Sequence, residues 1–131
     1  MEWKKEYATG VDQIDEQHKM LFKMSSDFKA ALNENVGERT YGMFLKYLTS
    51  YCKSHFRYEE KCMDDHKCPV AKQNKTSHKM FLEKVTEFHQ RYDTHHFLQE
   101  DANELVKIID SWLDGHIINV DIHLKKRIKN K

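Results

Sequence analysis

Apolar residues along most of the chain recur with the three- and four-residue steps of an amphipathic α-helix. Four such rows can be followed, and each marks the face of one helix that would turn inward in a bundle. No stretch shows the alternating pattern that is typical of a half-buried β-strand. The four rows are Ile14, His18, Leu21, Ser25, Phe28 and Leu32; Leu45, Leu48, Cys52, His55, Glu59 and Cys62; Ala71, Asn74, His78, Phe81, Val85, Phe88 and Tyr92; and Leu105, Ile109, Trp112 and His116.

Turn-forming residues separate the four rows. The segment 35–37 (Asn-Val-Gly) lies between the first two rows, and the segment 67–69 (Lys-Cys-Pro) precedes the third, where a proline suits the first turn of a helix. The segment 93–96 separates the third row from the fourth, and Gly115 weakens the fourth helix near its end. Because short connections make long helices antiparallel neighbours, the sequence predicts an all-α, antiparallel, up-down-up-down four-helix bundle. We expect a single domain over residues 1–131.

Six positions on these inward rows carry polar side chains that are costly to bury. Burying one polar group without a partner costs roughly 2–7 kcal/mol, so six of them need a common explanation. Each lies near the start of the first or third helix, or near the end of the second or fourth, and these helix ends meet in an antiparallel bundle. We therefore expect one polar layer inside the bundle, formed by His18, His55, Glu59, Asn74, His78 and His116.

A further carboxylate lies just beyond the fourth row. His55 and Glu59 are four residues apart and so share a helix face. Asp121 follows His116 by five residues, an offset that points partly away on a straight helix. We expect a break after Gly115 that would bring Asp121 back to the layer.

The residue types in this layer indicate a metal centre. Four imidazoles and one or two carboxylates exceed the four ligands of a closed zinc site. They suit a pair of octahedral first-row metals bridged by carboxylates, and iron fits this mixed ligation better than manganese. A ferritin-like site would carry a Glu-x-x-His motif on each of two helices. The chain has no such motif, which counts against a ferritin-like oxidase or iron store.

Taken together, four short stretches resemble the hemerythrin family, and in particular its short, single-domain bacterial members. The resemblance runs from Trp3 to about Asp121 and is specific only when the stretches are combined. The stretches are 11–19 (VDQIDEQHK), 55–60 (HFRYEE), 78–81 (HKMF) and 112–117 (WLDGHI), followed by Asp121.

This resemblance implies a non-haem centre of two iron ions, bridged by an oxo or hydroxo group, that binds dioxygen. It also implies an apolar wall around the oxygen pocket, formed by Trp112, Leu113 and Ile117. The implied ligands are His18 and His55 for one iron, His78 and His116 for the other, and Glu59 and Asp121 as bridges.

The chain departs from the family pattern at one position. The third helix of the family carries His-x-x-x-His, whereas this sequence reads Asn74-Lys-Thr-Ser-His78, so the site is one histidine short. We expect water or another exogenous ligand to fill the gap, with Asn74 as a weak ligand or as a hydrogen-bond partner of that water. Asp65 and His66 are nearby candidate substitutes. A more open iron should oxidise faster, which favours sensing, scavenging or peroxide chemistry over durable oxygen carriage.

Three other polar or charged features lie outside this pattern. Asp15, three residues before His18, either accepts a hydrogen bond from that histidine or stabilises the positive start of its helix. The residues Cys62, His66 and Cys68 are too few and too irregularly spaced for a zinc site. The basic stretch 125–131 is expected to be a solvated terminus.

Composition limits the remaining classes of function. The 22 Lys and Arg residues nearly balance the 21 Asp and Glu residues, which argues against a nucleic-acid or membrane-surface partner. No apolar run approaches the roughly 20 residues of a membrane span. The first residues lack the apolar core of a signal peptide, and the three cysteines form no Cys-x-x-Cys pair, so we expect reduced thiols in a cytoplasmic protein. We also expect a monomer with an unidentified redox partner.

Three functions follow from these features. The leading hypothesis is a dioxygen-binding protein that acts as a carrier, store or sensor rather than as an enzyme. The alternative is a di-iron enzyme or scavenger that acts on peroxide, nitric oxide or oxygen, with small anions as further ligands. A metal store without oxygen chemistry is the third hypothesis.

Overall fold

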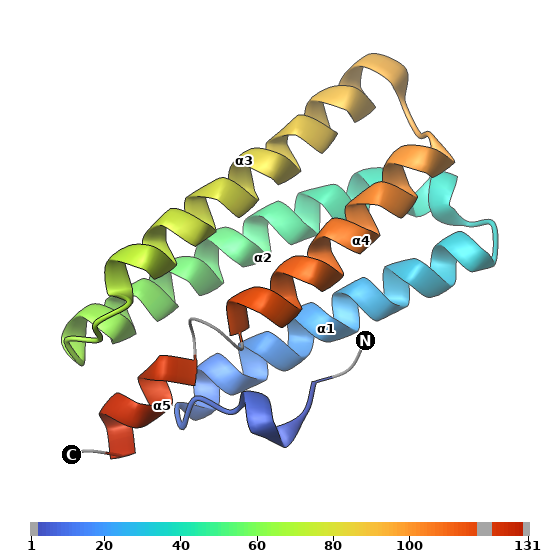
Figure 1. The fold of residues 1–131 in the computed structure, drawn as a ribbon. Coiled ribbons are helices and arrows are strands. Elements are labelled where there is room, and N and C mark those ends of the chain that lie inside the picture. The colour runs from blue at the N-terminus through green and yellow to red at the C-terminus, as the bar shows by residue number, and fades with distance from the viewer. Residues whose placement is uncertain (1–2, 118–121, 130–131) are drawn as a thin grey trace.

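The computed structural model describes residues 3–117 and 122–129 of the chain, and four long helices dominate it. Successive helices run in opposite directions and are joined by short connections (Figure 1). The described residues contain no strand, so the predicted all-α, antiparallel four-helix bundle is confirmed. The long helices are α1 (Asp12–Asn33), α2 (Gly37–Asp65), α3 (Ala71–His95) and α4 (Gln99–His116).

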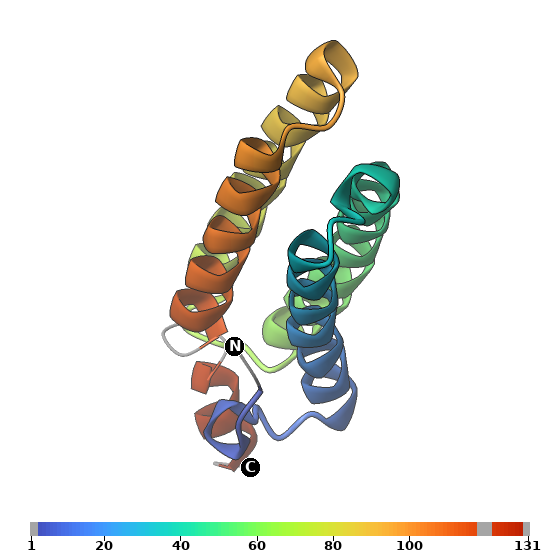
Figure 2. The same cartoon turned by 90° about the vertical axis from the view of Figure 1, so that its right-hand side faces the viewer.

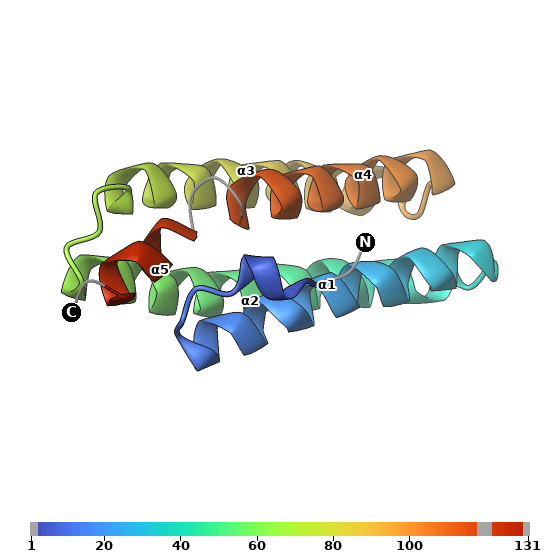
Figure 3. The same cartoon turned by 60° about the horizontal axis from the view of Figure 1, so that its bottom comes forward.

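The bundle consists of two helical hairpins that pack face to face. Helices α1 and α2 form one hairpin and α3 and α4 form the other, as Figure 2 and Figure 3 both show. Helix α2 contacts α3 as well as α1, and α1 contacts α4. The starts of α1 and α3 therefore lie at the same end of the bundle as the ends of α2 and α4 (Figure 1).

Two of the predicted turns end their helices in the same way. Asn35 and Lys67 have φ angles of 61° and 51°, a left-handed conformation that stops an α-helix. After α2, the Cys68 backbone N–H donates to the Met63 carbonyl at 2.8 Å, and the buried side chains of these two residues pack together. The turn after α3 lies later than predicted, because α3 continues to His95 and the left-handed residue is His96.

The core has a large part and a small part. The large cluster fills the bundle along most of its length, with Phe88 and Leu105 fully buried. The small cluster lies beside the end of α2 and the start of α1 and contains Ile14, Met63 and Cys68. The polar layer described below lies at this end of the bundle.

A fifth helix, α5 (Ile122–Lys129), covers the small cluster. Its Leu124 side chain is fully buried against Ile14, Met63 and Cys68. Residues 125–129, which were expected to belong to a solvated terminus, continue this helix, and Lys126 is exposed. A single apolar side chain is a weak signal in a basic sequence, and only the packed neighbours show that it anchors a helix.

The N-terminal arm crosses the same end of the molecule. A 3₁₀ turn, η1 (Lys5–Tyr7), places the Tyr7 ring parallel to the Phe22 ring, with a centroid distance of 5.7 Å.

None of the described helices is both long and apolar enough to cross a membrane.

Candidate metal centre

The structure brings the six predicted polar residues into one buried layer. Each comes from the helix and the helix end that the sequence indicates, and none is more than 5% exposed. The layer lies between the large apolar cluster and the small one. Its members are His18, His55, Glu59, Asn74, His78 and His116.

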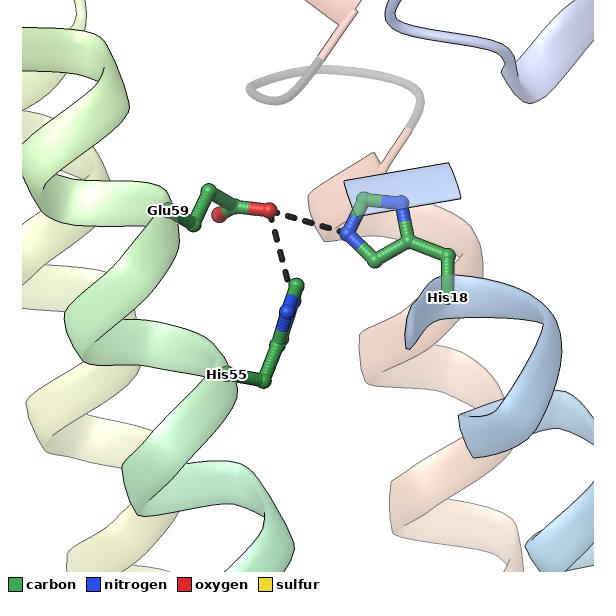
Figure 4. Close-up of side chains that lie close together, drawn as sticks. All are labelled: His18, His55 and Glu59. Carbon is green, nitrogen blue, oxygen red and sulfur yellow. Dashed lines mark hydrogen bonds and ion pairs between the residues drawn. The ribbon is translucent and has the colours of Figure 1, made fainter. Parts of the chain in front are cut away.

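One oxygen of the Glu59 carboxylate faces the first pair of helices. Glu59 Oε2 lies 2.9 Å from His18 Nε2 of α1 and 3.3 Å from His55 Nε2 of α2 (Figure 4). One donor atom from each of these three residues lies within 4.8 Å of the other two. This set can hold a metal ion, and we name it the first half-site.

The other carboxylate oxygen faces the second pair of helices. Glu59 Oε1 lies 3.0 Å from His78 Nε2 of α3 and 3.7 Å from His116 Nε2 of α4. These three residues also place one donor atom each within 4.8 Å of the others, and they form the second half-site. A single carboxylate therefore joins two histidine pairs, which is the arrangement of a bridging ligand.

The charge of this carboxylate is set by its neighbours. Burial raises the pKa of the Glu59 carboxyl, but hydrogen bonds from the four surrounding histidines outweigh burial and hold the pKa well below its usual range. Glu59 is therefore an anion in the middle of the bundle, where an uncompensated charge would be very costly.

Three further side chains hold the histidines from outside the layer. Each contacts the outer ring nitrogen, Nδ1, and each is the sequence neighbour of a layer residue on the preceding helix. Because adjacent residues on an α-helix point about 100° apart, these neighbours face sideways to the next helix. The pairs are Gln17 Oε1 with His55 at 2.6 Å, Glu60 Oε2 with His78 at 2.9 Å, and Ser77 Oγ with His116 at 2.8 Å.

Sequence reasoning did not single out these three partners. The available signal was their adjacency to residues His18, Glu59 and His78, because a polar residue beside an inward-facing ligand points toward a neighbouring helix. Which histidine it reaches depends on helix packing.

The outer hydrogen bonds provide a test of whether a cation fits. An amide oxygen and a carboxylate only accept hydrogen bonds, so His55 and His78 carry their protons on Nδ1. When these rings are neutral, the lone pairs of Nε2 face the Glu59 oxygens at 3.3 and 3.0 Å. Lone pairs facing a carboxylate at these distances repel each other unless a second ring proton, as in the hydrogen bonds that lower the Glu59 pKa, or a metal ion lies between them. The donor set therefore fits a metal ion.

Aromatic rings wall the second half-site. The Phe56 ring lies parallel to the His78 ring at 3.8 Å between centroids, and the Trp112 ring lies parallel to the His116 ring at 4.4 Å. Trp112 also donates its indole N–H to Ser77 Oγ at 3.3 Å. The other two predicted wall residues, Leu113 and Ile117, are buried next to this region of α4.

The predicted second bridge cannot be placed. Helix α4 is described as far as His116 and Ile117 keeps a helical backbone, so the break expected after Gly115 stays a prediction. Asp121 lies outside the described residues, so its position relative to Glu59 stays a prediction.

Asn74 lies in the layer, one helical turn before His78. It is fully buried, and neither its amide oxygen nor its amide nitrogen has a hydrogen-bond partner among residues 3–117 and 122–129. A buried amide is normally hydrogen-bonded, often to an ordered water. This is the behaviour expected of a residue that partners an exogenous ligand.

The other residues considered from the sequence lie around this layer. Asp15 is buried and accepts hydrogen bonds from the Thr9 backbone N–H at 2.8 Å and the Thr9 hydroxyl at 2.9 Å. These bonds fix the N-terminal arm to the first turn of α1, and a role toward His18 stays a prediction. His66 contacts the carbonyl and the sulfur of Cys62, which lies one turn after Glu59.

The fold and this layer define a class: an antiparallel helical bundle with a buried histidine–carboxylate site that can hold cations. Residues 9–127 match the family described as the Hemerythrin HHE cation binding domain. The chain therefore belongs to the hemerythrin family, and membership implies binding of non-haem iron.

Individual relatives agree with this assignment. The chain is 28% identical over 119 residues to a bacteriohemerythrin of Pseudomonas aeruginosa, covering 91% of this chain and 75% of the relative. It is 26% identical over 125 residues to the bacteriohemerythrin of Clostridium acetobutylicum, covering 91% and 94%. It is also 27% identical over 130 residues to Myohemerythrin-1 of Phascolopsis gouldii, covering 96% and 92%.

Proposed function

We propose that this protein holds two iron ions, one in each half-site, and binds dioxygen reversibly at this centre. The observation that carries the proposal is the division of the Glu59 carboxylate, with one oxygen facing His18 and His55 and the other facing His78 and His116. A carboxylate shared in this way suits two ions of a hard or borderline metal such as iron. The similarity to proteins named bacteriohemerythrin and myohemerythrin supports the same proposal.

In this proposal the ligands are five of the six layer residues, all but Asn74, together with Asp121. The iron pair supplies the electrons for reversible binding of a diatomic molecule, and the protein supplies a fixed and dry environment. Gln17, Glu60 and Ser77 hold three of the rings so that their Nε2 atoms face inward. The six ligands are His18, His55, Glu59, His78, His116 and Asp121.

The apolar residues beside the second half-site would protect the bound molecule. Phe56 and Trp112 stack on His78 and His116, and Leu113 and Ile117 are buried in the same apolar cluster as Phe56, so this side of the half-site is apolar. Excluding water limits the proton transfer that would release an oxidised product. We therefore place the oxygen pocket at the second half-site.

The test is a metal analysis combined with an optical titration. The protein is loaded with ferrous iron without oxygen, the iron content per chain is measured, and spectra are recorded before oxygen, with oxygen, and after removal of oxygen under vacuum. Two irons per chain and a visible absorption that appears with oxygen and disappears under vacuum are expected. One iron or none, with no oxygen-dependent absorption, would refute the proposal.

A second candidate function rests on Asn74. Its unpartnered, buried amide favours an exchangeable ligand on the second iron, and such a position suits a scavenger or enzyme that acts on peroxide, nitric oxide or oxygen. In the same titration, rapid and irreversible oxidation would favour this candidate over a carrier. Sustained consumption of peroxide or nitric oxide with an added reductant would then identify the substrate.

A further inference from the structure

The three outer hydrogen bonds do not offer the histidines the same chemistry. His55 meets a neutral amide oxygen and His116 meets a neutral hydroxyl, whereas His78 meets the carboxylate of Glu60 at 2.9 Å. His78 therefore lies between two carboxylates, with Glu59 Oε1 at 3.0 Å from Nε2 and Glu60 Oε2 at 2.9 Å from Nδ1. Among these three contacts, only the one at the second half-site brings a carboxylate to a histidine.

A charged acceptor does more than orient a ring. A hydrogen bond from an imidazole N–H to a carboxylate is roughly twice as strong as one to a neutral acceptor, and it makes the opposite nitrogen a better electron donor. A stronger donor and a nearby negative charge both favour the more highly charged state of a bound metal. An imidazole that is hydrogen-bonded to a neutral acceptor would favour the oxidised state of the metal less.

Glu60 is also partly exposed to solvent. Its side chain is 29% exposed and lines a surface groove of about 570 Å³ along α3. Lys75 lines the same groove, but its ammonium group is paired with Asp64 at 2.9 Å. The groove leaves one side of the Glu60 carboxylate open to solvent, while Oε2 contacts His78.

We propose that Glu60 is a positioning residue that makes the two half-sites unequal, so that the iron held by His78 and His116 is the one more readily oxidised. This proposal rests on the proposed function, because it needs iron in the layer. In this proposal Glu60 does not bind the second iron. It acts on that iron only through its hydrogen bond to His78. The proposal gives the two adjacent glutamates different roles. Glu59 binds both ions, whereas Glu60 increases electron donation from His78 to the second ion.

The first experiment measures the midpoint reduction potentials of the iron-loaded protein. Glu60→Gln keeps a hydrogen-bond acceptor for His78 but removes the charge, and Gln17→Glu places the same charge on His55. Glu60→Gln should raise the potential, and a tenfold larger loss of affinity for ferric than for ferrous iron corresponds to a rise of about 59 mV. Gln17→Glu should lower the potential of the iron in the first half-site. The double variant should reverse the order of the two potentials, while their mean returns toward the wild-type value.

Glu83→Gln is the matched control. Glu83 is exposed and lines the same groove as Glu60, so this change removes one negative charge from the same surface. Its potential should equal that of the wild type. The proposal is overturned if Glu60→Gln shifts the potential no more than Glu83→Gln does, or if Gln17→Glu shifts it in the same direction as Glu60→Gln.

A second measurement separates this proposal from the proposed function. Anaerobic ferrous iron titrations report how many ions the wild type binds, and fewer than two would refute the proposed function whatever Glu60 does. In Glu60→Gln, the affinity of one ion should fall about tenfold while the other changes by less than about twofold. Equal weakening of both ions, or of neither, would refute the unequal half-sites.

Discussion

The two ends of the bundle differ in the side chains that fill its interior: one end is aromatic and apolar, and the other is polar. At the end far from α5, the aromatic rings of Phe28 and Phe44 stack at 4.1 Å, and Tyr41 contacts Tyr92 and Phe97. At the other end, the same helix faces carry four histidines and a glutamate. The helices are continuous through both ends, so the difference lies only in the side chains that fill the inward positions.

This difference separates stability from function within one fold. Burial of large apolar side chains contributes most of the folding free energy, and the apolar end has many of them. A polar layer contributes little or even costs stability when no cation is present, because charged groups lose their hydration. Substitutions at the two ends should therefore have effects of different kinds.

The largest effect on metal binding is expected for Glu59→Gln. This change removes the shared charge while preserving size, so both half-sites lose their anionic ligand. Metal affinity should fall by more than about 100-fold, which is the upper range for losing an outer partner of a ligand. Iron content after anaerobic loading and desalting measures this, with Glu83→Gln as the control for a surface charge. A Glu59→Gln protein that retained both irons would contradict the bridging role.

The largest effect on stability is expected at the apolar end, for Phe88→Ala. Phe88 is fully buried, and it lies ten residues beyond His78, roughly 15 Å along the helix. The cavity should lower the free energy of unfolding of the metal-free protein by about 3–5 kcal/mol, as measured by urea denaturation. The iron content of the folded variant should equal that of the wild type. Loss of iron at a temperature where the variant is folded would show that the two ends are not independent.

A smaller effect is expected for Asn74→His, which adds an imidazole to the polar layer. A further ligand should occupy the exchangeable position on the second iron and slow oxidation by oxygen on the order of tenfold. The loss of the oxygen-dependent absorption with time measures this rate. Asn74→Asp is a useful comparison, because it keeps the shape but adds an anion. An unchanged rate in Asn74→His would mean that Asn74 does not face the exchangeable position.

The smallest effect concerns the acid stability of the metal-free protein. The pKa of the Glu59 carboxyl is held below its ordinary value of 4.5, so the folded state binds this proton less readily than the unfolded chain. The stabilisation is therefore fully present above about pH 4.5 and is lost as the pH falls through the lower, folded-state pKa. Unfolding free energies measured between pH 6 and pH 3 should decline less steeply in Glu59→Gln than in the wild type. Parallel profiles would contradict the assignment of this slope to Glu59.

The fold could be predicted from the sequence because it depends on periodicity. Rows of apolar residues at helical spacing determine which face of each helix turns inward, and the short connections determine that neighbours are antiparallel. The turns at Asn35 and Lys67 occur where predicted, whereas the turn after α3 was placed too early. Helix α5 was missed because one buried leucine in a basic stretch gives no periodic signal.

The sequence by itself also determined which side chains make up the polar layer. His18, His55, Glu59, His78 and His116 lie on inward faces near helix ends that meet, so their convergence follows from helix geometry and direction alone. It did not determine which atoms meet. The division of the Glu59 oxygens between two histidine pairs depends on the rotation of each helix about its axis.

Only the tertiary structure decided the outer partners of the histidines. Gln17, Glu60 and Ser77 each serve a histidine on the next helix, and no spacing along the chain connects the members of these pairs. Packing of the large apolar cluster sets the axial position and rotation of the helices, and so it decides which side chains come within hydrogen-bond distance. The sequence therefore determined which side chains meet in the polar layer, and the packing determined how each of them is held and which charges surround it.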